Sequence, residues 1–344
     1  MNLLRNKDAL NPFPRYLDKI CLTPLGLAGV VILLVLPMIP GLNSEYILRW
    51  LTLAAYFAAC TIIFDFTAGF INIVNFGFMA FCGVGAYCSA LLVTNLGLSP
   101  WLGMVCGGLL TGLIGLFTGV ITLRLRGIFA ACLTWFVGLA MMGLCTKLVW
   151  LTRGPAGLSV PKLFETYSNV PYYYTIVIGI LACYLICSLL VRSKMGLAFK
   201  AIGQNMEAAQ TSGVNPVHYR VVNFVISCTL AGVLGGFYAH YIGILTPDIM
   251  HTSKTMEVLA ISYIGGRGSL WGGVFAAFPL MVGMELLRST FAHLPGIHLL
   301  VYGVLLIIVM IHFPGGIAAE YYYLVDKLKN TKPVRWATSC AVHD

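Results

Sequence analysis

Long runs of apolar residues dominate this chain, and they decide what it can fold into. Nine of these runs are long enough for a helix to cross a membrane: 22–40, 45–65, 77–94, 100–123, 128–149, 172–191, 217–245, 269–288 and 297–313. A helix needs roughly 20 such residues to cross a hydrocarbon layer of about 30 Å. A tenth run, Thr255 to Gly266, has only about twelve residues. It is either a short span or a broken helix that lines a cavity.

The composition agrees with lipid as the main solvent of this protein. Apolar residues make up 59% of the chain and charged residues only 10%, with a mean hydropathy of +0.88. Soluble domains have about 25% charged residues, so an ordinary globular enzyme is excluded. We predict an all-α, polytopic membrane helix bundle of about ten transmembrane segments, one of them short or broken, with both termini in the cytoplasm. The predicted parts are a cytoplasmic segment 1–21, a transmembrane domain 22–320 and a cytoplasmic tail 321–344.

The basic residues orient this bundle. The chain has 21 Lys and Arg residues and a net charge of +9. With the N-terminus inside, most of them lie on the cytoplasmic side, as the positive-inside rule expects. The exceptions at or near the outer face are Arg49, Lys147, Arg153, Lys162, Lys254 and Arg288. Membrane topology therefore accounts for the positive charge, and we expect a lipid bilayer and no nucleic acid as partner. We expect the first apolar run to be an uncleaved span and not a signal peptide.

The sequence carries no motif of an enzyme. Most of its eleven cysteines lie in apolar runs and none forms a C-x-x-C pair, so we interpret them as small hydrophobic residues. Without a Gly-Lys dipeptide the chain has no phosphate-binding loop of the G-x-x-x-x-G-K-[ST] type. Zinc-protease and nucleophile-elbow motifs are missing as well. We expect no catalytic residue, no metal site and no cofactor bound by this chain.

Glycines four residues apart predict closely packed helices. In the run 100–123 they form the pairs Gly103 and Gly107, Gly108 and Gly112, and Gly115 and Gly119, and Gly232 and Gly236 repeat the spacing in a later span. Small residues at this interval let two helix backbones approach each other, which matters in lipid because no hydrophobic force holds helices together.

Two interrupted segments are candidates for a translocation path. The first runs from Asp65 to Gly77 and the second from Thr255 to Gly268, each just before a span. Matching interruptions in two halves of a chain are typical of internally repeated transporters, whose broken helices line the path. The candidate path residues are Asn72, Asn75, Gly77, Gly265 and Gly266. The alternative is that both segments are ordinary turns between helices.

Ionisable residues in apolar runs are costly, and they are candidates for function. Asp65 lies at the inner end of its span and Glu257 near the start of the short run, while Glu285 and Arg288 are close enough to neutralise each other. None makes a convincing mid-membrane proton relay, which weakens the hypothesis of a proton-driven carrier.

The loop 192–216 is longer than a connection between spans requires. Its residues predict two short helices: Gly203 breaks the first, Asn205 caps the second, and Glu207 lies in the first turn, where the helix dipole favours an anion. Gly213 ends the second helix.

We expect this second helix to be about eight residues, roughly 12 Å, long. Its apolar side would carry Met206, Ala208 and Ala209. Asn215-Pro216 then reads as the cap and first position of the next span. A helix that projects in this way suits contact with another protein; the alternative is an amphipathic segment on the lipid headgroups.

The stretch 205–213, N-M-E-A-A-Q-T-S-G, resembles the coupling motif of permease subunits of bacterial ABC importers. More of the chain is similar to one branch of these, the branched-chain amino acid permeases of the LivM type, over roughly residues 50 to 320. The blocks that carry the resemblance, in order, are Gly83-Val-Gly-Ala-Tyr87, Leu125-Arg-Gly-Ile-Phe129, Thr152-Arg-Gly-Pro-Ala-Gly-Leu158, Gly265-Gly-Arg-Gly-Ser-Leu-Trp-Gly272, Tyr302-Gly-Val-Leu-Leu-Ile-Ile308 and Phe313-Pro-Gly-Gly316.

At two places the chain departs from that family's pattern. Gly203-Gln204 stands where the family usually has an Arg-Asp pair before the coupling helix. Arg153 stands where the family tends to have the first glycine of T-G-G-x-x-G-L. The first change bears on contact with the ATPase, and the second lies in an outer loop that bears on docking of a binding protein.

The resemblance implies a permease subunit in a bacterial inner membrane that moves branched-chain, aliphatic amino acids into the cytoplasm. Its implied partners are a second, related permease, two ATPase subunits that carry ATP and magnesium, and a solute-binding protein. The implied coupling residues are Asn205, Glu207, Ala208, Ala209 and Gly213. A path lined mainly by Gly, Ala, Asn and aromatic residues suits a zwitterion with an aliphatic side chain. Urea or short-chain amides, and a carrier or channel that needs no ATPase, stay as alternatives.

Overall fold

The computed structural model describes residues 44–290, apart from 123, 124, 126 and 165–167, together with a few single residues on either side. Within this part the chain consists of helices joined by loops, with one short pair of strands. The long helices are α3 (Glu45–Ala68), α4 (Phe78–Leu96), α5 (Pro100–Thr122), α6 (Ile128–Lys147), α8 (Val170–Arg192), α11 (Pro216–Ile242) and α13 (Gly272–Thr290).

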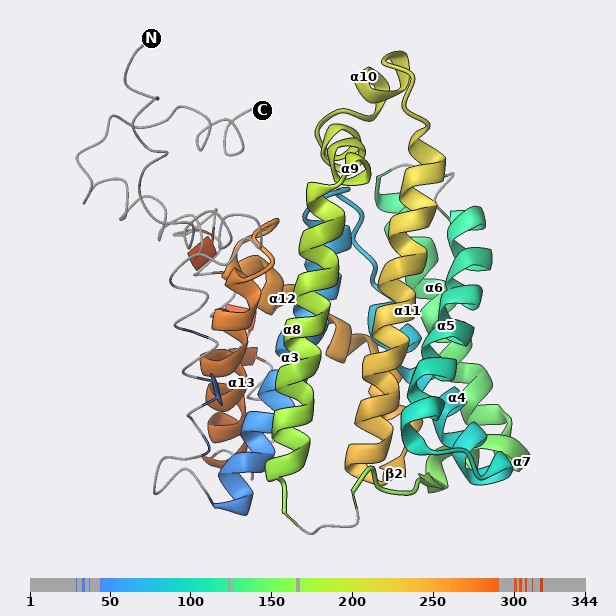
Figure 1. Ribbon diagram of the computed structural model, residues 1–344, viewed down its shortest axis with the longest axis vertical. Coiled ribbons are helices and arrows are strands. Elements are labelled where there is room, and N and C mark those ends of the chain that lie inside the picture. Colours follow the sequence, from blue (N-terminus) through green and yellow to red (C-terminus); the bar gives the residue numbers. More distant parts are fainter. Residues whose placement is uncertain are drawn as a thin grey trace, which may run out of the picture.

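Shorter elements connect them. The helices are α7 (Val149–Thr152), α9 (Lys194–Gln204), α10 (Met206–Thr211) and α12 (Thr252–Gly265), with 3-10 turns η2 (Gly154–Ala156) and η3 (Pro247–Met250). Strands β1 (Leu158–Ser159) and β2 (Ile244–Leu245) pair antiparallel, Leu158 opposite Leu245. Figure 1 shows α9 and α10 at one end of the bundle and α7 and β2 at the other. We refer to these as the α10 end and the β2 end.

Local sequence signals set the helix ends. Ser44 caps α3 through a hydrogen bond from the Ile47 backbone N–H, and Asn215 caps α11 through one from His218. Pro216 opens α11, where its missing N–H and fixed φ are tolerated. Gly97 ends α4 with a positive φ of 64°, a conformation that glycine adopts without strain.

Helix α11 lies at the centre of the bundle and packs against α3, α4 and α5. The glycines predicted to allow close approach do so. A methyl group on Gly232 would lie 3.0 Å from the Cα of Gly108 on α5, and one on Gly107 would lie 2.7 Å from the Gly85 carbonyl oxygen on α4. Such distances leave no room for a side chain, so the predicted close approach is confirmed at Gly107 and Gly232.

Large apolar side chains cover the outside of the bundle. Helix α5 exposes Leu109 and Phe117, and α6 exposes Phe129, Phe136 and Leu144. Exposed apolar surface on this scale is typical of contact with lipid or with another subunit. In the described part of the chain, six helices are long and apolar enough to cross a membrane: α3, α4, α5, α6, α8 and α11. The protein is a multi-pass membrane protein.

Most of the predicted spans are found as helices. The runs 45–65, 77–94, 100–123, 128–149, 172–191 and 217–245 correspond to the six helices above. Run 269–288 forms α13, which contains Pro279. The short run is α12, of 14 residues. The predicted spans 22–40 and 297–313 lie largely outside the described residues, as do the predicted terminal segments 1–21 and 321–344.

Candidate functional site

Helices α9 and α10 form a projecting unit at the α10 end, and they come from the loop predicted to couple the chain to another protein (Figure 1). Helix α9 is anchored by its apolar side. Phe199 is fully buried, and its ring contacts those of Phe66 on α3 and Tyr219 on α11, at centroid distances of 5.8 and 6.2 Å. The unit is therefore packed onto the ends of two long helices.

The cap of α10 is as predicted. The Asn205 Oδ1 atom accepts hydrogen bonds from the backbone N–H groups of Glu207 and Ala208, both at 3.0 Å. Glu207 lies in the first turn, and Gly213, with φ of 85°, follows the helix. Six residues form α10, fewer than the eight expected.

The prediction that Gly203 breaks the first helix is wrong, because α9 continues through it to Gln204. Its missing side chain serves packing: a methyl group at this position would overlap the carbonyl group of Phe70. The glycine therefore brings α9 against the segment that follows α3. This contact links the α10 end to the first interrupted segment.

Helix α10 also rests on buried groups below it. Ala209 is buried and Met206 is half-buried, whereas Ala208, predicted on the same apolar side, is exposed. The Arg220 guanidinium of α11, 5% exposed, donates to the Leu125 carbonyl at 3.2 Å and lies 3.9 Å from the Met206 sulfur. The exposed residues of this helix and of the turn after it are Glu207, Ala208 and Gln210 to Gly213.

Helix α12 begins inside the bundle and runs toward the α10 end. At its start, Thr252 accepts a hydrogen bond from the Trp135 indole of α6 at 3.0 Å, and Thr255 accepts one from the Met79 N–H at 3.2 Å. At its far end, the loop 266–271 meets the end of α3. The first interrupted segment, 69–77, therefore runs beside α12 in the opposite direction.

Asp65 holds this arrangement together. Its carboxylate, 3% exposed, accepts the backbone N–H groups of Gly268 at 2.8 Å and Leu270 at 3.1 Å. The Ser262 hydroxyl of α12 lies 3.4 Å away. Buried backbone groups need such partners, so the structure gives this deep carboxylate a connecting role.

The five predicted path residues lie in segment 69–77 and at the end of α12, and four of them are buried. Asn75 is buried and its Oδ1 atom accepts the Gly77 N–H at 3.0 Å, which forms the turn into α4. Gly77 packs against the Thr134 carbonyl of α6, and Gly265 against the backbone at Gly272 and Gly273. Gly266 is buried, with φ of 106°. Asn72, with φ of 60°, is the exposed member of the set.

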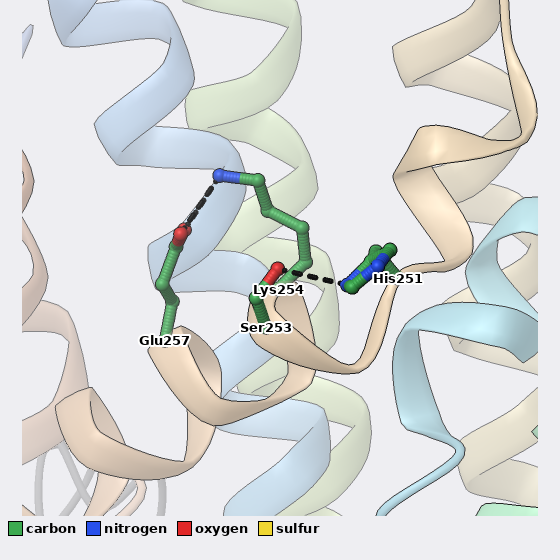
Figure 2. Close-up of polar contacts among 4 residues, drawn as sticks. All are labelled: His251, Ser253, Lys254 and Glu257. Carbon is green, nitrogen blue, oxygen red and sulfur yellow. Dashed lines mark hydrogen bonds and ion pairs between the residues drawn. The ribbon is translucent and has the colours of Figure 1, made fainter. Parts of the chain in front are cut away.

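Two charged residues of α12 lie beside the middle of α3. Lys254 Nζ lies 2.8 and 3.0 Å from the two carboxylate oxygens of Glu257. Figure 2 shows this ion pair and, on the other side of the same turn, the contact between Ser253 and His251. Lys254 Nζ is also 5.8 Å from the ring centroid of Phe57, at the middle of α3.

The sequence interpretation placed Lys254 at or near the outer face, and the structure places it at the level of the middle of α3 instead. Residues 243–251 turn back between the helices before α12 begins, which the sequence pattern did not reveal. The signal that could have found the pair was the Lys-x-x-Glu spacing at the start of the short run.

Arg153, one of the two departures from the family's sequence pattern, lies at the β2 end. Arg153 follows α7 in the left-handed conformation, with φ of 58°. This is a conformation that glycine adopts without penalty and that other residues adopt at a cost. The geometry explains why a glycine suits this position.

The described residues hold no group of three or more His, Cys, Asp or Glu residues that could bind a metal. His240, fully buried near the end of α11, is satisfied by Ser89 at 2.9 Å and the Pro161 carbonyl at 2.7 Å.

Comparisons with known proteins agree with the membrane fold. A family model described as the permease component of the branched-chain amino acid transport system matches residues 46–310. The chain is 28% identical, over 277 residues, to the high-affinity branched-chain amino acid transport system permease protein LivM of Salmonella typhimurium. The aligned residues cover 72% of this chain and 64% of that relative. The match thus spans less than two thirds of the relative's length.

Two other relatives carry different names. The nucleoside ABC transporter permease protein NupC of Lactococcus lactis is 28% identical, over 50% of this chain and 60% of its own. The autoinducer 2 import system permease protein LsrC of Escherichia coli is 29% identical, over 74% of this chain and 75% of its own. No solved structure matches the chain.

Proposed function

The chain belongs to the family of permease components of branched-chain amino acid transport systems, and from this premise we propose that it is the permease subunit of an ABC importer. Its cargo is a branched-chain, aliphatic amino acid, moved into the cytoplasm of a bacterium across the inner membrane. The observation that carries the proposal is the projecting unit of α9 and α10, in which the capped helix α10 lies beyond the ends of the long helices.

The coupling surface consists of Asn205, Glu207, Ala208, Ala209 and Gly213. Asn205 and Gly213 fix the two ends of α10, Ala209 seats it, and Glu207 and Ala208 face outward. Movement of the ATPases on ATP binding pushes this helix, and the contacts of Gly203 with Phe70 pass the push to the segment beside α12. Such rigid-body movement is typical of packed helices.

The proposed assembly supplies what the chain lacks. A second, related permease completes a heterodimer, two ATPase subunits bind ATP and magnesium beneath the α10 end, and a solute-binding protein docks at the β2 end. The permease itself is not an enzyme and binds no cofactor. In this arrangement the α10 end is cytoplasmic, the chain spans the membrane about ten times and both termini are in the cytoplasm.

The names of the relatives leave other cargoes to be tested. LivM supports branched-chain amino acids, while NupC and LsrC are named for nucleosides and autoinducer 2. Urea and short-chain amides are a further alternative. Competition against labelled leucine uptake by each of these compounds ranks them directly.

The experiment uses the importer purified with the subunits that accompany this chain, reconstituted in liposomes with its binding protein. We expect labelled leucine to enter only when ATP is on the α10 side. Uptake that needs no ATP would identify a carrier or channel instead.

Two variants test the coupling surface. Gly213→Pro forces φ from 85° to about −65°, and we expect it to abolish uptake while the subunits still assemble. Gly97→Pro makes the same kind of change at the β2 end, at another glycine with positive φ and open space around it. Unchanged uptake and ATPase coupling in Gly213→Pro would contradict the assignment.

A further inference from the structure

The start of α12 is a charged site inside the membrane. Helix α12 begins beside Trp135 of α6 and Met79 of α4, and Lys254 lies over Phe57, at the middle of the 24-residue α3. All three neighbours belong to helices that are long and apolar enough to span a membrane. The ion pair of Lys254 and Glu257 is therefore at hydrocarbon depth.

A charge at this depth is costly. A Lys or Asp at the centre of a spanning helix is rare and costly, and such residues face a bundle interior or a water-filled cavity and not lipid. The Lys254 side chain is 40% exposed and that of Glu257 only 6%. An ammonium group this exposed at this depth needs water, substrate or a partner subunit on its open side.

Packing alone does not account for the pair. Lys254 and Glu257 are three residues apart on one helix, so their ion pair connects no two elements of the fold. Asp65 differs in this respect, since its carboxylate joins α3 to the loop after α12. Lys254 also contacts Phe57 on α3, but an ion pair within one helix is costly at this depth and suits a functional role.

We infer that Lys254 and Glu257 bind the charged ends of an amino acid on its way through the membrane, an inference that rests on the proposed function. The Glu257 carboxylate accepts hydrogen bonds from the substrate ammonium group and Lys254 donates to the substrate carboxylate, while Phe57, beside Lys254, offers apolar contact to the aliphatic side chain. The positive end of α12, where the His251 side chain forms no cap, also favours the carboxylate.

The charge balance fits a zwitterion. Without substrate the two side chains neutralise each other at 2.8 Å. A zwitterion exchanges this one ion pair for two, so no uncompensated charge arises in either state. A substrate with a single net charge leaves one side chain unpaired at a depth where that is expensive.

The first test uses Glu257→Gln and Lys254→Met in the reconstituted importer, with Glu285→Gln on α13 as the control. We expect each of the first two to lower ATP-driven leucine uptake at least tenfold, while ATP hydrolysis stimulated by the loaded binding protein stays within twofold of wild type. The control should transport normally. Uptake within twofold of wild type in both variants would overturn the inference, as would an equal loss of uptake, stimulation and subunit assembly.

The second test does not alter the charges. In Phe57→Cys, at the residue beside Lys254, we expect a water-soluble methanethiosulfonate reagent to label the new thiol above the wild-type background, and leucine delivered by the binding protein to slow this labelling at least threefold. No labelling, or labelling that leucine leaves unchanged, would overturn the site.

These experiments distinguish failure of the proposed function from failure of the Lys254–Glu257 site. If the wild-type importer takes up no amino acid with ATP, the proposed function fails and the site with it. If the wild type takes up leucine but the charge variants behave like it, only the site fails.

Discussion

The Asp65 carboxylate of α3 accepts the backbone N–H of Gly268 at 2.8 Å, and so joins two segments more than two hundred positions apart in the chain. Its other oxygen accepts the Leu270 N–H. Through these bonds one side chain fixes the loop between α12 and α13 to the end of α3. The interrupted segment 69–77 begins at the same place, so this contact sets the position of both candidate path elements.

Removing the carboxylate should loosen this loop. In Asp65→Ala the backbone N–H groups of half-buried Gly268 and buried Leu270 lose their acceptor, and a buried group left unsatisfied costs about 1–3 kcal/mol. We expect the thermal unfolding midpoint in detergent to fall and backbone amide exchange at 266–271 to become faster. Asp65→Asn keeps one acceptor oxygen and should lie between Asp65→Ala and wild type. A midpoint for Asp65→Ala equal to that of wild type would show that the loop is held by other contacts.

The same glycine-to-alanine change should have opposite effects at two sites. A methyl group on Gly235 of α11 would overlap the backbone of Cys82 on α4, whereas one on Gly143 of α6 would meet nothing within 4 Å. Overpacking typically costs about 1–3 kcal/mol, and alanine favours a helix over glycine by about 1 kcal/mol. We therefore expect Gly235→Ala to lower the unfolding midpoint and Gly143→Ala to raise it. Equal shifts in both variants would argue against close packing of α4 and α11.

The sequence predicted the long helices and several of their ends because the signals are local. Apolar runs of spanning length, Asn205 before α10 and Asn215-Pro216 before α11 each act through residues a few positions away. The glycine pairs of α5 also predict close helix contacts, because two helix backbones can approach each other only where side chains are small or missing.

The depth of α12 could not be predicted in this way. It depends on residues 243–251 turning back into the bundle, and on contacts of Thr252 and Thr255 with α6 and α4 that are far away in sequence. Gly203 was misread for a related reason: a glycine inside a helix can mark a break or a close contact, and only the position of Phe70 distinguishes the two.

Arg153 should be less favourable than the glycine that the family tends to have there. Its φ of 58° costs a residue with a side chain about 1–2 kcal/mol in the folded protein. Replacement by glycine removes this strain but makes the unfolded chain more flexible, which costs about 0.4–1 kcal/mol of stability. Arg153→Gly should therefore stabilise the protein by about 0.5–1 kcal/mol and raise the unfolding midpoint slightly. Arg153→Ala removes the charge but keeps the strain, so it should not stabilise. A gain of the same size in Arg153→Ala would assign the effect to charge.

Asn205 should control the order of α10, and this can be measured without transport. In Asn205→Ala the N–H groups of Glu207 and Ala208 lose the oxygen that caps them, and loss of an N-cap typically costs about 1 kcal/mol. Because α10 has only six residues, the whole helix should fray, and amide exchange at 207–211 should become about fivefold faster. Asn205→Asp keeps a side-chain acceptor and adds a charge that the helix dipole favours, so its exchange should match wild type. If exchange at 207–211 is the same in Asn205→Ala as in wild type, contacts of Met206 and Ala209 with the bundle hold α10 in place without the cap.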